Sequence, residues 1–325
     1  MIMEETKMMS KNEFSKVLAE AVKAKLEQMG THVEIESREV LKNNGNVQNG
    51  LGISDGSNIQ SVFYIDAMYE RYVAGDCDLD RMAASVSENY LSNKPTDDFN
   101  LGRIMDYEQA KDHIVVSVRN AEKNEELLKT VPHDRVGDLA VMYRVEVTDC
   151  PGGGTGSVLI NDGLMRSYGI DQDTLREQAW KNTREQHPYS FLPMIEALKM
   201  MLPGVEEDFP VDLCPELDGR MYLLTNSGKE GGASYLCDMQ TLAEVAKKLG
   251  DNLIILPSSI HECIVLPESK GGELAMFKAM VEEVNATQVT PEEFLSDNVY
   301  CFDAQTQELS VYDGQSEAMN QVCLQ

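Results

Sequence analysis

Basic residues are scarce in this sequence. Its 325 residues include 28 lysines and arginines against 55 aspartates and glutamates, for a formal net charge of −27 at pH 7. A nucleic-acid groove needs clustered basic side chains to neutralise phosphates, and an anionic membrane surface repels an acidic protein. The composition therefore argues against a nucleic-acid partner and against a membrane partner. The acids are dispersed along the chain, which favours a solvated surface as their main role.

Long apolar runs are also missing. The first residues, MIMEETKMMSKNEF, carry charges where a secretory signal would have an apolar stretch. No uninterrupted apolar segment approaches the ~18 residues that a membrane-spanning helix requires. These observations predict a cytoplasmic protein.

Motifs for metals and cofactors are lacking as well. The seven cysteines are odd in number and include no CxxC pair, and the five histidines form no HExxH or HxH spacing. A disulfide framework and a structural zinc site are therefore not expected. The segment CPGGGTG, residues 150–156, lacks the Gly-Lys-Ser/Thr ending of a phosphate loop and joins two apparent strands. We expect no cofactor and no metal.

The N-terminal part has clear local signals. Ser10 and Glu13 form a capping box before an apolar pattern of helical spacing that runs to Met29. The alternating stretch HVEIESREVLKNNGNVQNGLGIS predicts strands around the turn at Asn44-Gly45. A further strand at SVFYID and a helix that begins near Asp78 follow. The polar segment 92–102, SNKPTDDFNLG, is typical of a linker, which predicts domains at 1–95 and 96–325.

Two later stretches resemble each other. MYRVEVTDCPGGGTGSVLINDGL, from Met142, and MYLLTNSGKEGGASYLCDMQTL, from Met221, each predict a strand, a glycine turn, a second strand and a helix that an Asp could cap. A third hairpin, NLIIL with IHECIVL, is followed by a helix with one apolar face. The predicted fold class is thus α+β, with mainly antiparallel sheets and repeated hairpin-plus-helix units packed by amphipathic helices. The candidate binding residues from the repeated segments are Tyr143, Tyr222, Gly153 and Gly231.

The hairpin LPSSIHECIVLP, residues 256–267, holds the candidate catalytic residues. On a strand His261 and Cys263 would point to one face and Glu262 to the other. A turn serine, Ser258 or Ser259, could reach the histidine, but no acid in this stretch completes the arrangement. A nucleophilic cysteine is also commoner at a helix N-terminus than within a strand. A structural hairpin, whose serines and histidine bind local backbone groups, is therefore the preferred interpretation.

Several of these segments together resemble a family of domain-of-unknown-function proteins from Lachnospiraceae and related gut Firmicutes. In order they are KNNG, YID, MYERY, VPHDRVGDLAVMYRVEV, INDGLMRSYGI, MYLLTN and LPSSIHECIVLP, from about residue 11 to about residue 313. The part from MYLLTN onward is also similar to the YtpQ-like family of bacilli, in which varied polar residues replace Ile260-His261-Glu262. The resemblance implies an intracellular bacterial protein and supplies no catalytic residues.

Three hypotheses follow for the function. The first is a non-enzymatic cytoplasmic binding or adaptor protein with a protein partner. An alternative is a hydrolase or transferase that uses His261 with Cys263 or with a turn serine. A second alternative is an acidic protein that mimics DNA, which would need the acids on one elongated face. The residue patterns favour the first.

Overall fold

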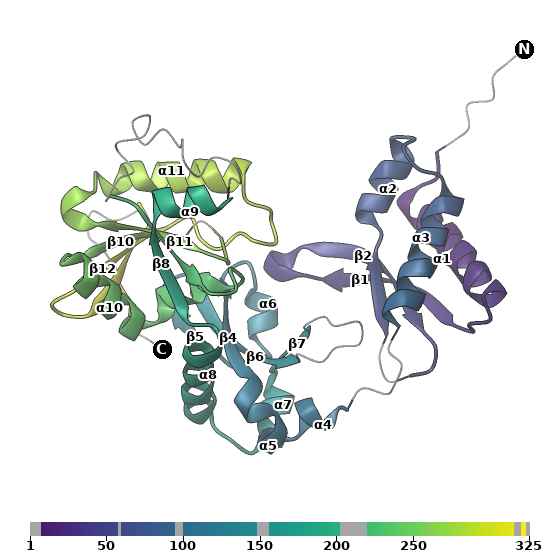
Figure 1. Ribbon diagram of the computed structural model, residues 1–325, viewed down its shortest axis with the longest axis horizontal. Coiled ribbons are helices and arrows are strands. Elements are labelled where there is room, and N and C mark those ends of the chain that lie inside the picture. Colours follow the sequence, from purple (N-terminus) through teal and green to yellow (C-terminus); the bar gives the residue numbers. More distant parts are fainter. Residues whose placement is uncertain are drawn as a thin grey trace, which may run out of the picture. The chain divides into compact units, whose positions relative to one another are not determined.

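The computed structural model describes residues 8–57, 60–94, 100–147, 156–201, 220–257, 259–314 and 320–322. Two compact units make up this part of the chain, and each is treated by itself (Figure 1). The first runs to Arg103 and includes Val147 and Gly156. The second comprises Ile104–Glu146 and the described residues from Ser157 onward. The candidate residues Gly153 and Ser258 lie outside the described residues.

The first unit combines three helices with a three-stranded antiparallel sheet in the order β1-β2-β3. The helices are α1 (Lys11–Gln28), α2 (Asp66–Val73) and α3 (Leu79–Asn93), and the strands are β1 (Glu34–Leu41), β2 (Val47–Ser54) and β3 (Ser61–Tyr64). The predicted capping box is confirmed, because the Ser10 hydroxyl accepts from the Glu13 N–H and the Glu13 carboxylate accepts from the Ser10 N–H. The predicted turn is also confirmed, with Asn44 at φ +59° in η1 (Asn43–Gly45). The apolar face of α1 packs into one core with strand and α3 residues: Phe14, Leu18, Val22, Leu26, Leu51, Ile53, Met82 and Val86.

The second unit begins with a small antiparallel sheet in the order β4-β6-β5, with β7 paired to β6. Its strands are β4 (Ile114–Asn120), β5 (His133–Val136), β6 (Leu139–Val147) and β7 (Gly156–Leu159). The helical segments around it are α4 (Gly102–Met105), α5 (Tyr107–Ala110), η2 (Lys111–His113), α6 (Glu125–Leu128), α7 (Asp162–Tyr168) and α8 (Gln172–Gln186). Helix α8 covers the free edge of β4, since Thr183 Oγ1 accepts from the Val116 N–H at 3.0 Å and Asn182 Nδ2 donates to the Ile114 carbonyl at 2.8 Å. Side chains thus satisfy an edge that would otherwise attract another strand.

A larger antiparallel sheet follows, in the order β14-β13-β12-β10-β11-β9-β8. Its strands are β8 (Tyr189–Pro193), β9 (Tyr222–Asn226), β10 (Leu253–Pro257), β11 (Cys263–Pro267), β12 (Val299–Asp303), β13 (Glu308–Tyr312) and β14 (Asn320–Val322). With it come α9 (Met194–Met201), η4 (Gly232–Cys237), α10 (Met239–Leu249), η5 (Glu268–Lys270) and α11 (Leu274–Thr287). Helix α11 packs Phe277 and Val281 on one face of the sheet, and α10 lies on the other (Figure 1).

One turn ties the two sheets of the second unit together. Asp138, between β5 and β6, accepts hydrogen bonds from the Ser296 hydroxyl at 2.7 Å and from the Tyr300 hydroxyl. Nearby, Asn120 donates its amide to the Leu295 carbonyl at 2.9 Å. Since these groups are buried or half-buried, the polar contacts fix how the sheets meet.

The α+β class with antiparallel sheets is confirmed, but the second of the two similar segments differs from its prediction. Ser234, Leu236 and their neighbours form the 3₁₀ helix η4 instead of a strand. The helix begins at a close backbone approach, because a Cβ at Gly232 would lie 2.5 Å from the Asn226 nitrogen. The helix cap also differs in the first segment, because Asn161 rather than Asp162 accepts from the Leu164 N–H.

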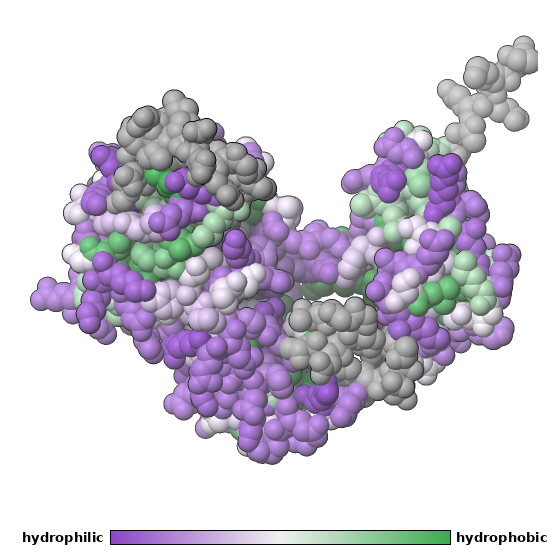
Figure 2. Space-filling view, in the orientation of Figure 1, coloured by the Kyte–Doolittle hydropathy of each residue, from purple (hydrophilic) through white to green (hydrophobic). Residues whose placement is uncertain are grey.

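The surface matches the composition. Hydrophilic residues cover most of the described face in Figure 2, and hydrophobic ones gather in smaller areas. Within the described ranges, every helix is too short or too polar to cross a membrane.

Candidate functional site

The hairpin predicted around residues 256–267 is present as β10 and β11, but His261 is not on a strand. Strand β11 begins at Cys263, which pairs with Leu224 of β9. His261 lies in the connecting loop two residues earlier. The expectation that His261 and Cys263 share one strand face therefore does not hold.

Cys263 has the environment of an inert core residue. Its side chain is fully buried, at 0% exposure, and burial raises the pKa of its thiol well above the ordinary value. Because the thiolate is the nucleophilic form, a thiol held protonated in the core is a poor nucleophile.

His261 is held by its backbone and its ring. Its N–H donates to the Ser259 hydroxyl at 3.0 Å, and its carbonyl accepts from the Thr225 hydroxyl at 2.8 Å. The ring Nδ1 accepts from the Gly231 N–H at 3.3 Å, and Nε2 lies 3.6 Å from Glu293 Oε1. Since Nδ1 is an acceptor, the ring proton belongs on Nε2, facing the glutamate. Gly231 allows this because it sits at φ +70°.

Ser259 makes no hydrogen bond to the His261 ring within the described residues. Its side chain is 8% exposed, and its hydroxyl oxygen accepts from the backbone N–H of His261, not from the ring. A serine activated by histidine would instead donate its hydroxyl proton to the imidazole. The side chain of Ser259 therefore binds the backbone of its own loop.

A pocket of about 450 Å³ nevertheless opens beside this loop. It lies among the loop, the turn after β9 and the C-terminal end of α11, and it is lined by Leu223, Thr225, Lys229, Ser259, His261, Glu262, Val284, Gln288, Val289 and Glu293. Its lining combines an ammonium, two carboxylates and an imidazole with the apolar side chains of leucine and valine. Such a lining can orient a bound group by hydrogen bonds and charge.

The two candidate tyrosines do not line that pocket. Tyr143 is fully buried and donates its hydroxyl to Asp134, and burial raises its pKa. Tyr222 stacks on Phe191 with ring centroids 4.9 Å apart. Tyr143 thus serves the core, and Tyr222 packs against its neighbour on β8.

Two buried carboxylates on the α8 side of the second unit were not foreseen. Asp134 accepts from Arg176 Nε at 2.8 Å and from Gln172 at 3.0 Å. Asp238 accepts from Arg184 at 2.9 and 2.6 Å, and from the Thr241 hydroxyl. Asp134 follows His133 in a segment that reads as a turn entering a strand. The arginines stand eight residues apart on α8, so their spacing on one helix face was a usable signal.

The pairs flank a cavity of about 210 Å³ that also has Trp180 and Cys237 in its lining. Each arginine already binds a carboxylate through two nitrogens, which neutralises its charge. These arginines therefore have few hydrogen-bond donors left for a ligand, and we assign the cavity a structural role.

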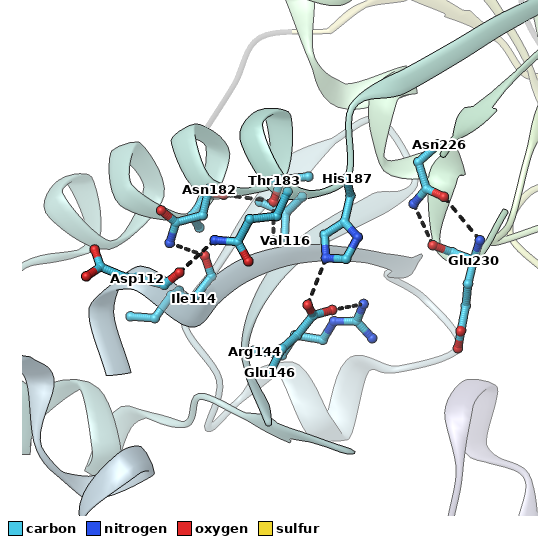
Figure 3. Close-up of polar contacts among 12 residues, drawn as sticks. Asp112, Ile114, Val116, Arg144, Glu146, Asn182, Thr183, His187, Asn226 and Glu230 are labelled. Atoms are coloured by element: carbon cyan, nitrogen blue, oxygen red, sulfur yellow. Dashed lines mark hydrogen bonds and ion pairs between the residues drawn. The ribbon is translucent and has the colours of Figure 1, made fainter. Parts of the chain in front are cut away.

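A third polar cluster lies at the end of α8. Figure 3 shows the His187 ring pointing at the Glu146 carboxylate, which also meets Arg144. The His187 Nε2 to Glu146 Oε2 distance is 2.7 Å, and Arg144 Nη2 donates to Glu146 Oε1 at 2.9 Å. Burial alone would raise the pKa of Glu146, but the His187 hydrogen bond and the Arg144 charge outweigh it and lower the pKa. The turn held by Asn226 and Glu230 lies beside this cluster.

No candidate metal centre emerges from the described part of the chain, where no three His, Cys, Asp or Glu side chains gather as ligands. Residues 11–304 match the model of a family described as "Family of unknown function (DUF5688)". Comparisons with curated proteins and with solved structures give no match.

Proposed function

We propose that this chain, which belongs to the DUF5688 family of unknown function, is a non-enzymatic binding protein that holds a protein partner at the pocket beside His261. The observation that carries the proposal is a pocket with converging polar groups, in which neither Cys263 nor Ser259 among the described residues is placed as a nucleophile. Cys263 is fully buried in the core, and the Ser259 hydroxyl oxygen accepts a hydrogen bond from the backbone N–H of His261. Binding of a partner would need only the charged, hydrogen-bonding and apolar groups that line the pocket.

The lining favours a polar side chain of a partner. Lys229 can bind a carboxylate, while Glu262 and Glu293 can bind an ammonium or a guanidinium. A volume of about 450 Å³ is at the small end of ligand pockets, so it suits one or two side chains rather than a whole helix. Apolar contacts with Val284 and Leu223 would exclude water around them.

We place the protein in the bacterial cytoplasm. The four cysteines in the described ranges, Cys77, Cys237, Cys263 and Cys301, are all free thiols. Free thiols are usual where glutathione and thioredoxin keep a compartment reducing. The acidic composition supports a partner other than nucleic acid.

The test is affinity purification of the tagged chain from its native cells, after nuclease treatment, with identification of bound proteins by mass spectrometry. Lys229→Asn removes the pocket's ammonium and suits the backbone, because Lys229 sits at φ +55° and Asn tolerates that region. Lys181→Asn, at an exposed position on α8, is the matched control.

A stoichiometric protein that Lys181→Asn retains and Lys229→Asn loses is the expected result. A partner that both variants retain moves the binding surface away from the pocket. A DNA-binding protein held by both variants would instead support the acidic mimic. Recovery of the chain with only a small molecule, seen by native mass spectrometry, overturns the protein-partner proposal.

A further inference from the structure

The second unit carries two arginines on one face of β4 and β6. Val115 pairs with Arg144 and Arg119 pairs with Ala140, so both arginine side chains leave the sheet on the same side. Helix α8 packs on the opposite side, where Tyr143 and Asp134 lie. Burial and, to a smaller extent, the charge of Arg144 lower the pKa of Arg119. This pair of cations is unusual in a chain of net charge −27.

Part of the hydrogen-bonding capacity of these two arginines is unused among the described residues. The Nε of Arg144 is buried and has no acceptor among the described residues. Arg119 donates only to the carbonyl of its neighbour Val118, at 2.9 Å, and has no carboxylate partner in the same part of the chain. A guanidinium has five N–H donors, and burying them without acceptors is costly.

Among the described residues, Glu146 is the acid that binds Arg144. Glu146 also holds the His187 ring at 2.7 Å, so its charge is divided between these two partners. The contrast with α8 is direct, because Arg176 and Arg184 each bind a buried aspartate. Burial and the nearby Arg144 charge lower the pKa of Arg119 to about 10, which still leaves it charged at pH 7. Arg119 therefore brings a positive charge to this face that forms no ion pair among the described residues.

We propose that Arg119 and Arg144 form a binding site for a small oxyanion, such as inorganic phosphate or a carboxylate. The planar guanidinium fork matches the paired oxygens of both groups. The site is open to solvent, since the Arg144 side chain is 25% exposed and Arg119 is half-buried. It stands on different strands from the His261 pocket and does not depend on that pocket's function.

The test is calorimetric titration of the full chain with sodium phosphate and, separately, with sodium succinate, in 0.15 M NaCl so that diffuse attraction is screened. Saturable binding of one anion is expected, and the better of the two tells phosphate from carboxylate. Arg119→Gln should weaken that binding at least about tenfold, the effect of one charged hydrogen bond. Arg135→Gln is the control, because Arg135 is exposed on the same sheet face.

Glu146→Gln gives an effect of opposite sign. It removes the competing negative charge while an amide keeps the shape, so the anion should bind several-fold more tightly. Arg119 forms no ion pair with the described residues, so its variant should fold even if a variant of Arg144 does not. Absence of saturable binding by the wild type overturns the proposal. So does an Arg135→Gln loss as large as that of Arg119→Gln, or weaker binding by Glu146→Gln.

Discussion

Asp134→Asn tests whether the buried pair with Arg176 stabilises the second unit. Asp134 is 2% exposed and binds Arg176, Gln172 and Tyr143. The asparagine side chain has no charge, and its NH₂ group must face one of the groups that donate a hydrogen bond to Asp134. Breaking a buried ion pair costs about 3–5 kcal/mol. Because the Arg176 side chain is 34% exposed and water can solvate it, we expect the lower end, about 3 kcal/mol.

Trp180 gives a direct assay. It is the single tryptophan of the chain and lines the same cavity as Asp134 and Arg176. Urea unfolding followed by its fluorescence therefore reports on the second unit. The control is Asp173→Asn, since Asp173 also binds Arg176, at 2.6 Å, but is 78% exposed. Asp173→Asn should lower the free energy of unfolding by only about 0–1 kcal/mol. Equal losses in the two variants would refute the reasoning that burial decides the effect.

The buried pair of Asp134 and Arg176 should make the stability of the second unit depend on pH. Burial alone would raise the pKa of Asp134, but hydrogen bonds from Arg176 and Tyr143 outweigh it and lower the pKa. An unfolded aspartate has a pKa of about 3.9, so the unfolded chain binds more protons as the pH falls. The stability that Asp134 provides is thus complete above about pH 4 and is lost as the pH falls through the folded value. The difference in the free energy of unfolding between wild type and Asp134→Asn should therefore shrink as the pH falls. A difference that grows on acidification would contradict this reasoning.

Three further outcomes are expected. Iodoacetamide at neutral pH should modify Cys77, which is partly exposed, and leave the buried Cys263 of the folded protein unmodified, as peptide mass spectrometry can show. Gly232→Ala should cost about 1–3 kcal/mol in urea unfolding, because its Cβ would lie 2.5 Å from a backbone nitrogen, while Gly228→Ala, with its nearest atom at 3.6 Å, should be near neutral. Residues 96–325 expressed alone should unfold at the same urea midpoint by tryptophan fluorescence as the full chain; a lower midpoint would show that the predicted domain boundary is wrong.

Features that depend on a few neighbouring residues could be predicted from the sequence. The Ser10–Glu13 capping box and the turn at Asn44 both use contacts within four residues. Because both partners of such a contact are close in the sequence, capping and turn patterns predict them.

Features that depend on packing could not be predicted in this way. Asp134 meets Arg176 from 42 residues away, and Asp138 meets Tyr300 from 162 residues away. One sequence does not tell which strands become neighbours, so it does not tell which charges meet. The position of His261 was missed for a related reason. Strand β11 starts where Cys263 finds Leu224 as its partner, and the alternation of side chains gives no sign of that point.

The strand order of the larger sheet bears on how the protein is made. Strand β9 lies between β8 and β11, yet β11 follows it only after η4, α10 and β10. During synthesis β9 therefore leaves the ribosome with one edge unpaired until the β10–β11 hairpin has emerged. Unpaired edges invite association with other chains. Nascent-chain aggregation and chaperone binding are thus expected to peak between the appearance of Asn226 and that of Pro267, when β11 closes the edge.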